Sequence, residues 1–256
     1  MSEVVTVLGV KVGVFSSQVA LERVKGFLAK GGSHRLFFVN AHTLNLAYED
    51  PEYRDVLNSA ELVLNDGIGV EIAARLFGVS FPENLVGTDF IPKLCALARD
   101  LNLSLYLLGS RPGVAELAAA KLQISFPGIN VVGTHHGYFS KEEEDEVVRA
   151  IQEASPDVLL VGFGNPFQEK WIALHQRLLR IPLSVGVGAF IDFMAGRVRR
   201  APWWARRARM EWVFRLVVEP RRLWRRYILG NPKFLWRVLR ARLFTAIGWR
   251  EDDRWA

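Results

Sequence analysis

Apolar and polar positions along the first 195 residues follow two alternating patterns. Short apolar runs, rich in Val and Leu and often ending in Gly or Asn, have the length and composition of buried strands. These runs lie at 35–40, 60–64, 103–109, 129–133, 157–164 and 182–188. Longer segments, in which apolar residues recur every three or four positions, predict helices. They lie at 17–31, 51–58, 67–77, 88–100, 112–126, 140–154 and 166–179.

This alternation predicts an α/β fold in which a mostly parallel, Rossmann-like sheet carries helices on both faces. One helix start is marked by a capping box, because Ser140 is followed three positions later by Glu143. Ligands of such folds bind beyond the carboxyl ends of the strands. Candidate chemistry is therefore expected where each strand passes into the next helix.

The junction at residues 60–70 presents a carboxylate at such a strand end. An apolar strand delivers Asn65 and Asp66, and Gly67 and Gly69 then lead into a helix. Asp66 has two interpretations: it caps the amides of the following helix, or it points into the crevice as a general base. The local pattern by itself favours the cap.

Two more junctions combine glycines with polar side chains. They read LLGSRPG (107–113) and GFGNPFQEKW (162–171), and each joins an apolar run to a helical segment. Small residues let the backbone approach a ligand, and free amides at a helix start favour phosphate, but a tight turn explains the same spacing. The spacing differs from G-x-G-x-x-G, which disfavours a dinucleotide-dependent oxidoreductase. The candidate ligand contacts here are Gly109, Ser110, Arg111, Gly162, Asn165, Gln168 and Glu169.

Charge is distributed unevenly along the chain, whose net charge is +6. Residues 1–196 hold 16 Lys and Arg against 22 Asp and Glu, whereas residues 197–242 hold 15 against 2. Such asymmetry indicates an electrostatic partner for one segment of the protein. We therefore predict a domain boundary near Gly196, with a main domain at 1–195 and a basic appendage at 196–256.

The appendage contains a segment with the profile of an interfacial helix. On a helical wheel of residues 221–228, four arginines occupy one arc, and Leu223, Trp224, Tyr227 and Ile228 occupy the opposite arc. We expect this helix to end at Gly230–Pro232 and to bind an anionic membrane surface. Packing on the core and nucleic-acid binding are the alternatives, and we expect no nucleic acid because no known module is present. The candidate membrane contacts are Arg221, Arg222, Trp224, Arg225, Arg226 and Tyr227.

Composition restricts the compartment. Half of the residues are apolar and 23% are charged, as in globular proteins. The single Cys95 excludes an internal disulfide, suits a reducing environment and is expected to pack in the core. Residues 1–16 lack a basic, apolar leader, and no apolar run reaches the roughly 18 to 20 residues of a membrane span. We therefore expect a cytoplasmic protein, peripheral on the inner face of the membrane.

Several blocks together carry a family resemblance. NAHTLNLAYEDPEYRDVLNSAELVLNDGIGV, VGTDFIPKL, GTHHGYFS, LLVGFGNPFQEKWI and GVGAFIDFMAGRVRRAP follow one another in this order. From about residue 4 to at least residue 235 the chain closely resembles the WecG/TagA/CpsF family of bacterial glycosyltransferases. The resemblance implies inverting transfer of an N-acetylmannosamine-type sugar from a UDP-sugar donor. It also implies a polyprenyl-diphosphate-linked acceptor at the cytoplasmic membrane face and a role in surface polysaccharide synthesis.

The resemblance also assigns site residues. It makes Asp66 the catalytic base that deprotonates the acceptor hydroxyl, and it places Gln168 and Tyr138 against the sugar nucleotide. Many family members have Thr-Pro-Asn or Thr-Ile-Asn in place of Asn40–His42, and Arg in place of Asn84. The further candidate substrate contacts that border this site are Asn40, His42, Asn65, Gly87, Thr88 and Asp89.

No Asp-x-Asp pair lies within the first 196 residues, so we expect a metal-independent reaction with no cofactor. Helix N-termini and arginines, some of them from the appendage, would then stabilise the negative charge of the departing diphosphate. The sequence leaves open the donor sugar, the acceptor and whether the protein forms a homo-oligomer. A non-catalytic, membrane-peripheral protein that binds nucleotide sugars is the alternative function.

Overall fold

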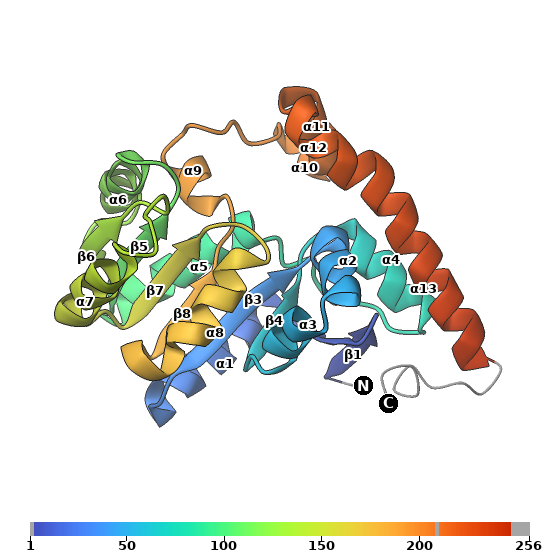
Figure 1. Cartoon of the computed structure of the whole chain (residues 1–256), viewed down its shortest axis with the longest axis horizontal. Helices are drawn as coiled ribbons and strands as arrows, with labels where there is room; N and C mark the ends of the chain where they lie inside the picture. Colours follow the sequence, from blue (N-terminus) through green and yellow to red (C-terminus); the bar gives the residue numbers. More distant parts are fainter. Residues whose placement is uncertain (1–2, 208–209, 247–256) are drawn as a thin grey trace.

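A computed structural model describes residues 3–207 and 210–246 of the chain. Its centre is an eight-stranded sheet in the order β1-β2-β4-β3-β8-β7-β5-β6 (Figure 1). The first two strands form an antiparallel hairpin, and every other neighbouring pair is parallel. The strands are β1 Val4–Val7, β2 Val10–Gly13, β3 His34–Val39, β4 Leu62–Asn65, β5 Ser104–Gly109, β6 Asn130–His135, β7 Val158–Gly162 and β8 Leu183–Gly186.

Helices cover both faces of this sheet, and alternating strand residues divide the core into two layers. Leu36 and Phe38 of β3 face one layer, and Phe37 and Val39 face the other. The first layer is completed by α1 Ser17–Lys30, α5 Gly87–Asp100, α6 Val114–Ser125 and α9 Phe190–Met194. The second is completed by α2 Ala41–Glu49, α3 Pro51–Asn58, α4 Ile68–Leu76, α7 Glu144–Ala154 and α8 Phe167–Leu179.

The predicted α/β fold with a mostly parallel sheet is confirmed, and each predicted strand and helix of the main domain has a counterpart. The reciprocal hydrogen bonds of the predicted capping box form, because Ser140 N donates to Glu143 Oε2 over 2.7 Å and Glu143 N donates to Ser140 Oγ over 3.4 Å. They close the turn just before α7, which begins at Glu144 and not near Ser140. Cys95 is buried in the core. Sequence reasoning missed the β1–β2 hairpin, whose turn residues Leu8 and Gly9 lack an Asn-Gly or Asp-Gly signal. It also missed α2 and the short α9.

The C-terminal segment is more helical than the sequence predicted. After α10 Trp203–Arg207 and α11 Glu211–Val218, α12 Pro220–Trp224 passes through a π-helical turn, Arg225–Leu229, into α13 Gly230–Ala246. The expected helix end at Gly230–Pro232 is therefore wrong. Pro232 lies in the first turn of α13, directly after the π-helical turn.

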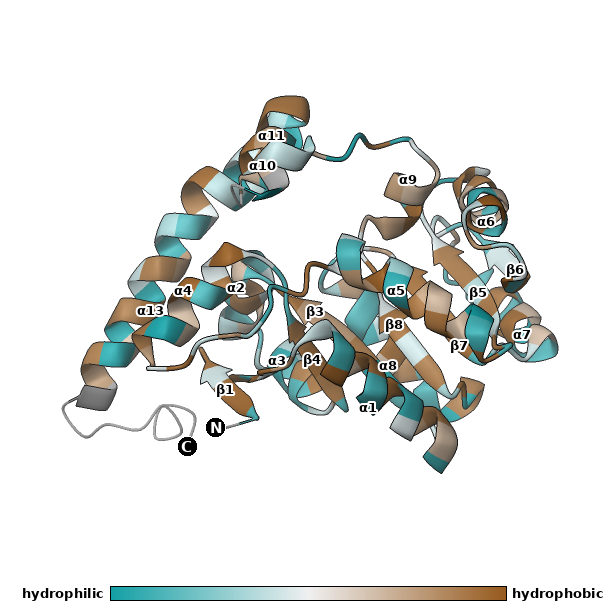
Figure 2. Ribbon diagram, turned by 180° about the vertical axis from the view of Figure 1, so that it is seen from behind, coloured by the Kyte–Doolittle hydropathy of each residue, from teal (hydrophilic) through white to brown (hydrophobic). Residues whose placement is uncertain are grey.

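Helix α13 docks on the main domain along α2 and α4, as Figures 1 and 2 show from opposite sides. Phe234, Val238 and Ala241 of α13 are buried in the second core layer together with Leu44 of α2 and Val70 of α4. On the same contact, Arg237 donates to Asn45 Oδ1 over 2.9 Å. The appendage thus shares its apolar core with the sheet domain, and the boundary near Gly196 remains a prediction.

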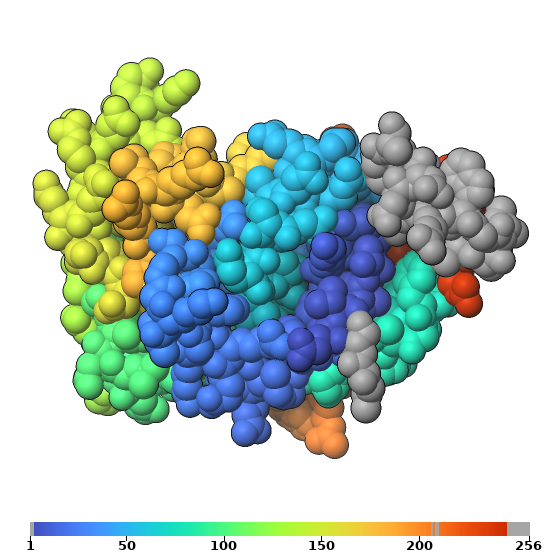
Figure 3. Space-filling model, turned by 90° about the horizontal axis from the view of Figure 1, so that it is seen from below, coloured from blue at the N-terminus to red at the C-terminus, as the bar shows by residue number. Residues whose placement is uncertain are grey.

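The two ends of the parallel strands differ. In Figure 1 the carboxyl ends point toward α9, α10 and the extended segment 197–202, which crosses above the sheet. Figure 3 shows the opposite end from below, where side chains of the N-terminal part, in blue and cyan, form much of a continuous surface. The tail therefore lies over the end of the sheet at which α/β folds bind ligands.

Candidate active site

A cleft of about 2310 Å³ lies between the carboxyl ends of the strands and the C-terminal helices. Its floor includes Asp66 after β4, Gly162 at the end of β7 and Gly186 at the end of β8. Its far wall includes Trp212 of α11 and Tyr227 of the π-helical turn. Segments far apart in the chain thus face one another across one cavity.

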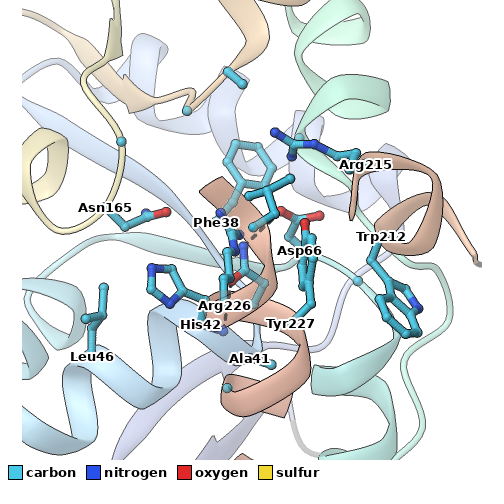
Figure 4. A pocket seen from close by; sticks show the side chains of 18 of the residues that line it. Phe38, Ala41, His42, Leu46, Asp66, Asn165, Trp212, Arg215, Arg226 and Tyr227 are labelled. Atoms are coloured by element: carbon cyan, nitrogen blue, oxygen red, sulfur yellow. Dashed lines mark hydrogen bonds between the residues drawn. The ribbon is translucent and has the colours of Figure 1, made fainter. Parts of the chain in front are cut away.

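Asp66 lies directly beyond strand β4 and does not cap the helix that follows. The N-cap position of α4 is Gly67, which has no side-chain cap bond, and Gly67 N donates instead to Asn84 Oδ1 over 2.8 Å. The carboxylate of Asp66 accepts a hydrogen bond of 3.4 Å from Asn40 Nδ2. Because the amides of α4 leave this carboxylate unused, the cap interpretation fails and the side chain faces the cleft (Figure 4).

Burial raises the pKa of Asp66 above its ordinary value. The hydrogen bond from Asn40 and the positive charges of Arg226 and Arg215 oppose this rise, and the negative charge of Asp89 adds to it. A carboxylate with a raised pKa is a stronger proton acceptor once it is ionised. The surroundings of Asp66 are therefore suited to a general base.

Two arginines of the C-terminal segment enter the cleft beside Asp66. Figure 4 shows Arg215 of α11 and Arg226 of the π-helical turn directed toward the carboxylate from different sides. The buried Nε atoms of both guanidinium groups lack hydrogen-bond partners among residues 3–207 and 210–246. The guanidinium groups also lie over the rings of Phe193 and Tyr227. A buried N–H without a hydrogen-bond partner is costly, so the two Nε donors favour an anionic ligand.

His42 lies beside Arg226 on the wall formed by α2 (Figure 4). Burial and the positive charge of Arg226 lower the pKa of His42 to about 4, although Glu49 opposes the shift. The imidazole is therefore neutral near pH 7. It can exchange hydrogen bonds with a ligand but adds no positive charge to the cleft.

Glycines bring the ends of β5, β7 and β8 together. Gly109 has φ +146, and a Cβ on it would lie 2.6 Å from the Gly162 carbonyl oxygen. A Cβ on Gly162 would lie 2.9 Å from the Gly188 carbonyl oxygen. At Gly109 the missing side chain thus allows close packing of the strand ends, in agreement with the tight turn that was the alternative to ligand binding. The next residue, Ser110, lines the cleft. Its Oγ donates a hydrogen bond of 2.6 Å to Asp192 Oδ1.

The Gln-Glu pair at the start of α8 is buried. Gln168 Oε1 accepts from Gly188 N over 3.0 Å and from Gly164 N over 3.3 Å, so this side chain ties the β7 and β8 loops together. Glu169 is fully buried and holds Asn165, whose side chain points into the cleft. Gln168 and Glu169 thus shape the floor of the cleft from beneath.

Thr88 and Asp89, at the start of α5, hold the segment that crosses above the sheet. Arg200 of that segment donates to Thr88 Oγ1 over 3.1 Å and pairs with Asp89. Arg200 Nε also lies 4.0 Å from Glu211 Oε1 of α11, within the range of an ion pair. Both predicted substrate contacts line the cleft, and they also anchor the appendage above it.

The structure gathers most of the predicted site residues in this cleft. The lining residues among them are Asn40, His42, Asp66, Gly87, Thr88, Asp89, Ser110, Arg111, Tyr138, Gly162, Asn165 and Gln168. Asn65, Gly109 and Glu169 do not line it, and Asn65 is fully buried with its Nδ2 bonded to Glu83 O. Of the predicted membrane contacts, Arg221 and Trp224 lie outside the cleft lining, whereas Arg222, Arg225, Arg226 and Tyr227 line it.

Sequence reasoning did not single out Arg215, Asp192 or Tyr53, and each reaches the site from a different part of the chain. Arg215 resembles any other arginine of the basic tail in the sequence. Asp192 follows β8, in a junction that carries no recognisable catalytic motif. Tyr53 stands in an ordinary amphipathic helix, α3, where an aromatic residue is expected to pack in the core. Only the fold brings Arg215 and Asp192 to the cleft and Tyr53 to the buried Glu169 beneath it.

Neither a metal-binding cluster nor a membrane span occurs in the described part of the chain. There, no three His, Cys, Asp or Glu side chains gather in a way that could hold a metal ion. No helix among residues 3–207 and 210–246 combines the length and the apolar character that a membrane span requires.

Comparison with known proteins adds a family to this geometry. Residues 5–247 match the glycosyl transferase WecG/TagA/CpsF family. A Bacillus subtilis (strain 168) protein is 33% identical over 202 residues, which cover 79% of this chain and 77% of the relative. A Staphylococcus aureus (strain MRSA252) protein is 30% identical over 240 residues, 93% of each chain. Both relatives are named N-acetylglucosaminyldiphosphoundecaprenol N-acetyl-beta-D-mannosaminyltransferase.

Proposed function

This chain belongs to the glycosyl transferase WecG/TagA/CpsF family, and we propose that it moves an N-acetylmannosamine-type sugar from UDP to a polyprenyl-diphosphate-linked acceptor. The reaction serves the synthesis of a bacterial surface polysaccharide. The names of the two relatives support this choice of sugar and acceptor. The observation that carries the proposal is the cleft in which the Asp66 carboxylate meets two arginines whose Nε atoms have no hydrogen-bond partner among the described residues.

Asp66 acts as the base. Its carboxylate accepts the proton of the acceptor hydroxyl while that oxygen attacks the anomeric carbon of the donor sugar, and the bond from this carbon to the diphosphate breaks. Attack from the face opposite the diphosphate inverts the anomeric configuration. The raised pKa of Asp66 and its fixed position against Asn40 both support this role.

Arg215 and Arg226 stabilise the leaving group. The departing UDP gains negative charge on its diphosphate, and cationic groups placed in advance lower the free energy of that transition state. The two guanidinium groups lie beside the cleft carboxylate, and their Nε atoms have no partner within the described residues. Guanidinium groups suit this task because they bind phosphate oxygens with more than one N–H. The appendage would then complete the catalytic cleft.

The nucleotide binds above the ends of β5, β7 and β8. Ser110, Gly137 and Gly188 line this part of the cleft, where the backbone can approach a ligand closely. Tyr138 lies beside them with an exposed ring that is free to stack on a base. Asp192, held by Ser110, presents a carboxylate that can accept hydrogen bonds from ribose or base.

The outer surface of the appendage binds the membrane. Trp236, Leu239 and Leu243 follow one another along the exposed side of α13, and Arg240 is exposed nearby. Figure 2 shows apolar and polar positions alternating along this helix. Trp203 and Trp204 of α10 are exposed as well. Exposed aromatic, aliphatic and basic side chains together suit an anionic lipid surface, and the lipid-linked acceptor lies in that surface.

The test is transfer with defined substrates. Purified full-length protein should release UDP from UDP-N-acetylmannosamine only when a polyprenyl-diphosphate N-acetylglucosamine acceptor is present. Asp66→Asn is the matched control, because it preserves the shape of the side chain and removes its basicity. A protein that binds UDP-N-acetylmannosamine tightly but never releases UDP with this acceptor would be a binding protein or would use another acceptor. UDP-glucose and UDP-N-acetylglucosamine, each offered with the same acceptor, test the choice of donor.

A further inference from the structure

Glu169 is a buried carboxylate that meets only hydrogen-bond donors. Its Oε1 accepts from Asn165 Nδ2 and from Gln168 Nε2, each over 2.6 Å, and its Oε2 accepts from Tyr53 Oη over 3.0 Å. The side chains of Glu169 and Tyr53 are both fully buried. Tyr53 belongs to α3, a helix that packs against α8, and it does not line the cleft. No charged partner of Glu169 is present among the described residues.

This arrangement fixes the orientation of the Asn165 amide. An oxygen that accepts two amide N–H groups carries no proton, so only the amide nitrogen of Asn165 can face it. The amide oxygen of Asn165 must then point the other way. Asn165 lines the cleft opposite Asp66 (Figure 4). Its side chain also forms a hydrogen bond with Tyr53, so Tyr53 restrains this amide both directly and through Glu169, and the amide oxygen is left to face the cleft.

In Gln168, in contrast, both the oxygen and the nitrogen of the side-chain amide form hydrogen bonds within the protein. Its Oε1 accepts from the backbone of Gly188 and Gly164, and its Nε2 donates to Glu169. It is almost completely buried. Of the two amides that Glu169 holds, Asn165 is therefore the one that offers an acceptor to a ligand.

We propose that Tyr53 is a positioning residue which, through Glu169, locks Asn165 with its carbonyl oxygen toward the cleft, and that Asn165 selects a donor sugar carrying a hydroxyl or amide N–H at that point. The proposal rests on the proposed function, because it requires a UDP-sugar in the cleft. An acceptor fixed in advance discriminates strongly, since a sugar without the matching donor leaves a polar group unpaired. Tyr53 contributes by restraining the carboxylate and not by touching the ligand.

The experiment is a double-mutant cycle read by calorimetric titration with UDP-N-acetylmannosamine and, separately, with UDP. Tyr53→Phe and Asn165→Ala should each weaken binding of UDP-N-acetylmannosamine about tenfold and change binding of UDP less than about twofold. The double variant should bind no more weakly than Asn165→Ala alone, because Tyr53 acts through Asn165. Tyr106→Phe is the matched control: it removes another buried hydroxyl, 3.5 Å from Thr134 O and outside the cleft lining, and should change neither affinity.

Glu169→Gln provides a conservative variant in case removal of the Tyr53 hydroxyl impairs folding. The glutamine oxygen can still accept from Asn165 and Gln168 while its amide nitrogen turns to Tyr53 Oη, so binding of UDP-N-acetylmannosamine should stay within about threefold of wild type. Losses that add in the double variant, or equal losses for UDP and UDP-N-acetylmannosamine, would overturn the positioning role. A wild-type protein that binds neither ligand would instead refute the proposed function itself.

Discussion

Asn40 donates a hydrogen bond of 3.4 Å from Nδ2 to the Asp66 carboxylate while its Oδ1 accepts from His42 N and Thr43 N at the start of α2. The same side chain thus caps a helix and holds the proposed base. Asp66→Asn preserves the shape of the base and removes its proton affinity. Turnover should fall by about 10² or more, as measured by UDP release at saturating donor and acceptor.

The control for this variant is its stability. Because burial raises the pKa of Asp66 in the native state, the ionised carboxylate destabilises the fold near neutral pH. The stabilising contribution of such a group is present below its unfolded pKa and disappears as the pH rises through its folded pKa. The asparagine of the variant lacks the charge, so its melting temperature should rise by about 2 °C or more. Near-normal turnover would exclude Asp66 as the base.

The pH profile follows from the same shift. A base works only when it is ionised, so kcat/KM should fall as the pH decreases through the folded pKa of Asp66. That acid limb should lie above the ordinary Asp value of about 4. Asn40→Ser keeps a helix cap but removes the Nδ2 donor, which lowers the pKa of Asp66 in the wild type, so the limb should move to higher pH. If the acid limb of kcat/KM does not move in Asn40→Ser, the group that titrates in this limb is not Asp66.

The position of Arg226 over the cleft can be tested through His42. Burial and Arg226 both lower the pKa of His42, to about 4. Arg226→Met removes the charge and keeps most of the volume, so the pKa should rise but stay below the ordinary value of about 6.5, because burial persists. NMR titration of the imidazole measures this change. Arg221→Met, at an exposed arginine outside the cleft lining, is the matched control and should leave the titration unchanged.

Metal dependence is predicted to be absent. The appendage supplies arginines where many transferases place a bridging cation, so EDTA should leave the rate of transfer largely unchanged. The assay compares initial rates before and after chelation at fixed ionic strength. Loss of activity that Mn²⁺ or Mg²⁺ restores would reveal a set of ligands that involves the substrate diphosphate.

Membrane binding is predicted to depend on the outer surface of the appendage. Charge reversal of Arg221 and Arg240 should weaken co-sedimentation with anionic vesicles, because each basic residue near such a surface contributes roughly 1 kcal/mol. Trp236→Ser should weaken it too, through loss of the apolar contact. Ile124→Ser, at an exposed residue of α6, should have no effect. Unchanged sedimentation of the charge-reversed protein would argue against a membrane role for this surface.

Truncation near Gly196 would expose the second core layer. Phe234 and Val238 cover apolar residues of α2 and α4, so the shortened protein should keep its sheet but tend to associate. Circular dichroism and light scattering would report the two effects separately. It should also lose transfer activity even with a water-soluble acceptor, because Arg215 and Arg226 go with the tail. Full activity on a soluble acceptor would refute their role in the cleft.

The sequence by itself determined the layered fold and the position of Asp66. Short apolar runs and three-to-four-residue periods are local properties of the chain, and a strand that leads directly to Asp66 must deliver it to the ligand-binding end of a parallel sheet. The capping box at Ser140 and the basic composition of the tail could be read in the same way. These features depend on neighbours in the chain or on composition alone.

Only the tertiary structure decided what each polar side chain faces. The helical wheel placed Arg226 and Tyr227 on an outer surface, whereas the π-helical turn and the docking of α13 direct them into the cleft. The motif that contains Gln168 and Glu169 indicated ligand contacts, yet both side chains are buried, Asn165 is the half-buried amide that faces the cleft, and Tyr53 joins them from another helix. Contacts between distant segments depend on how helices pack on the sheet, and no local pattern of residues encodes that packing.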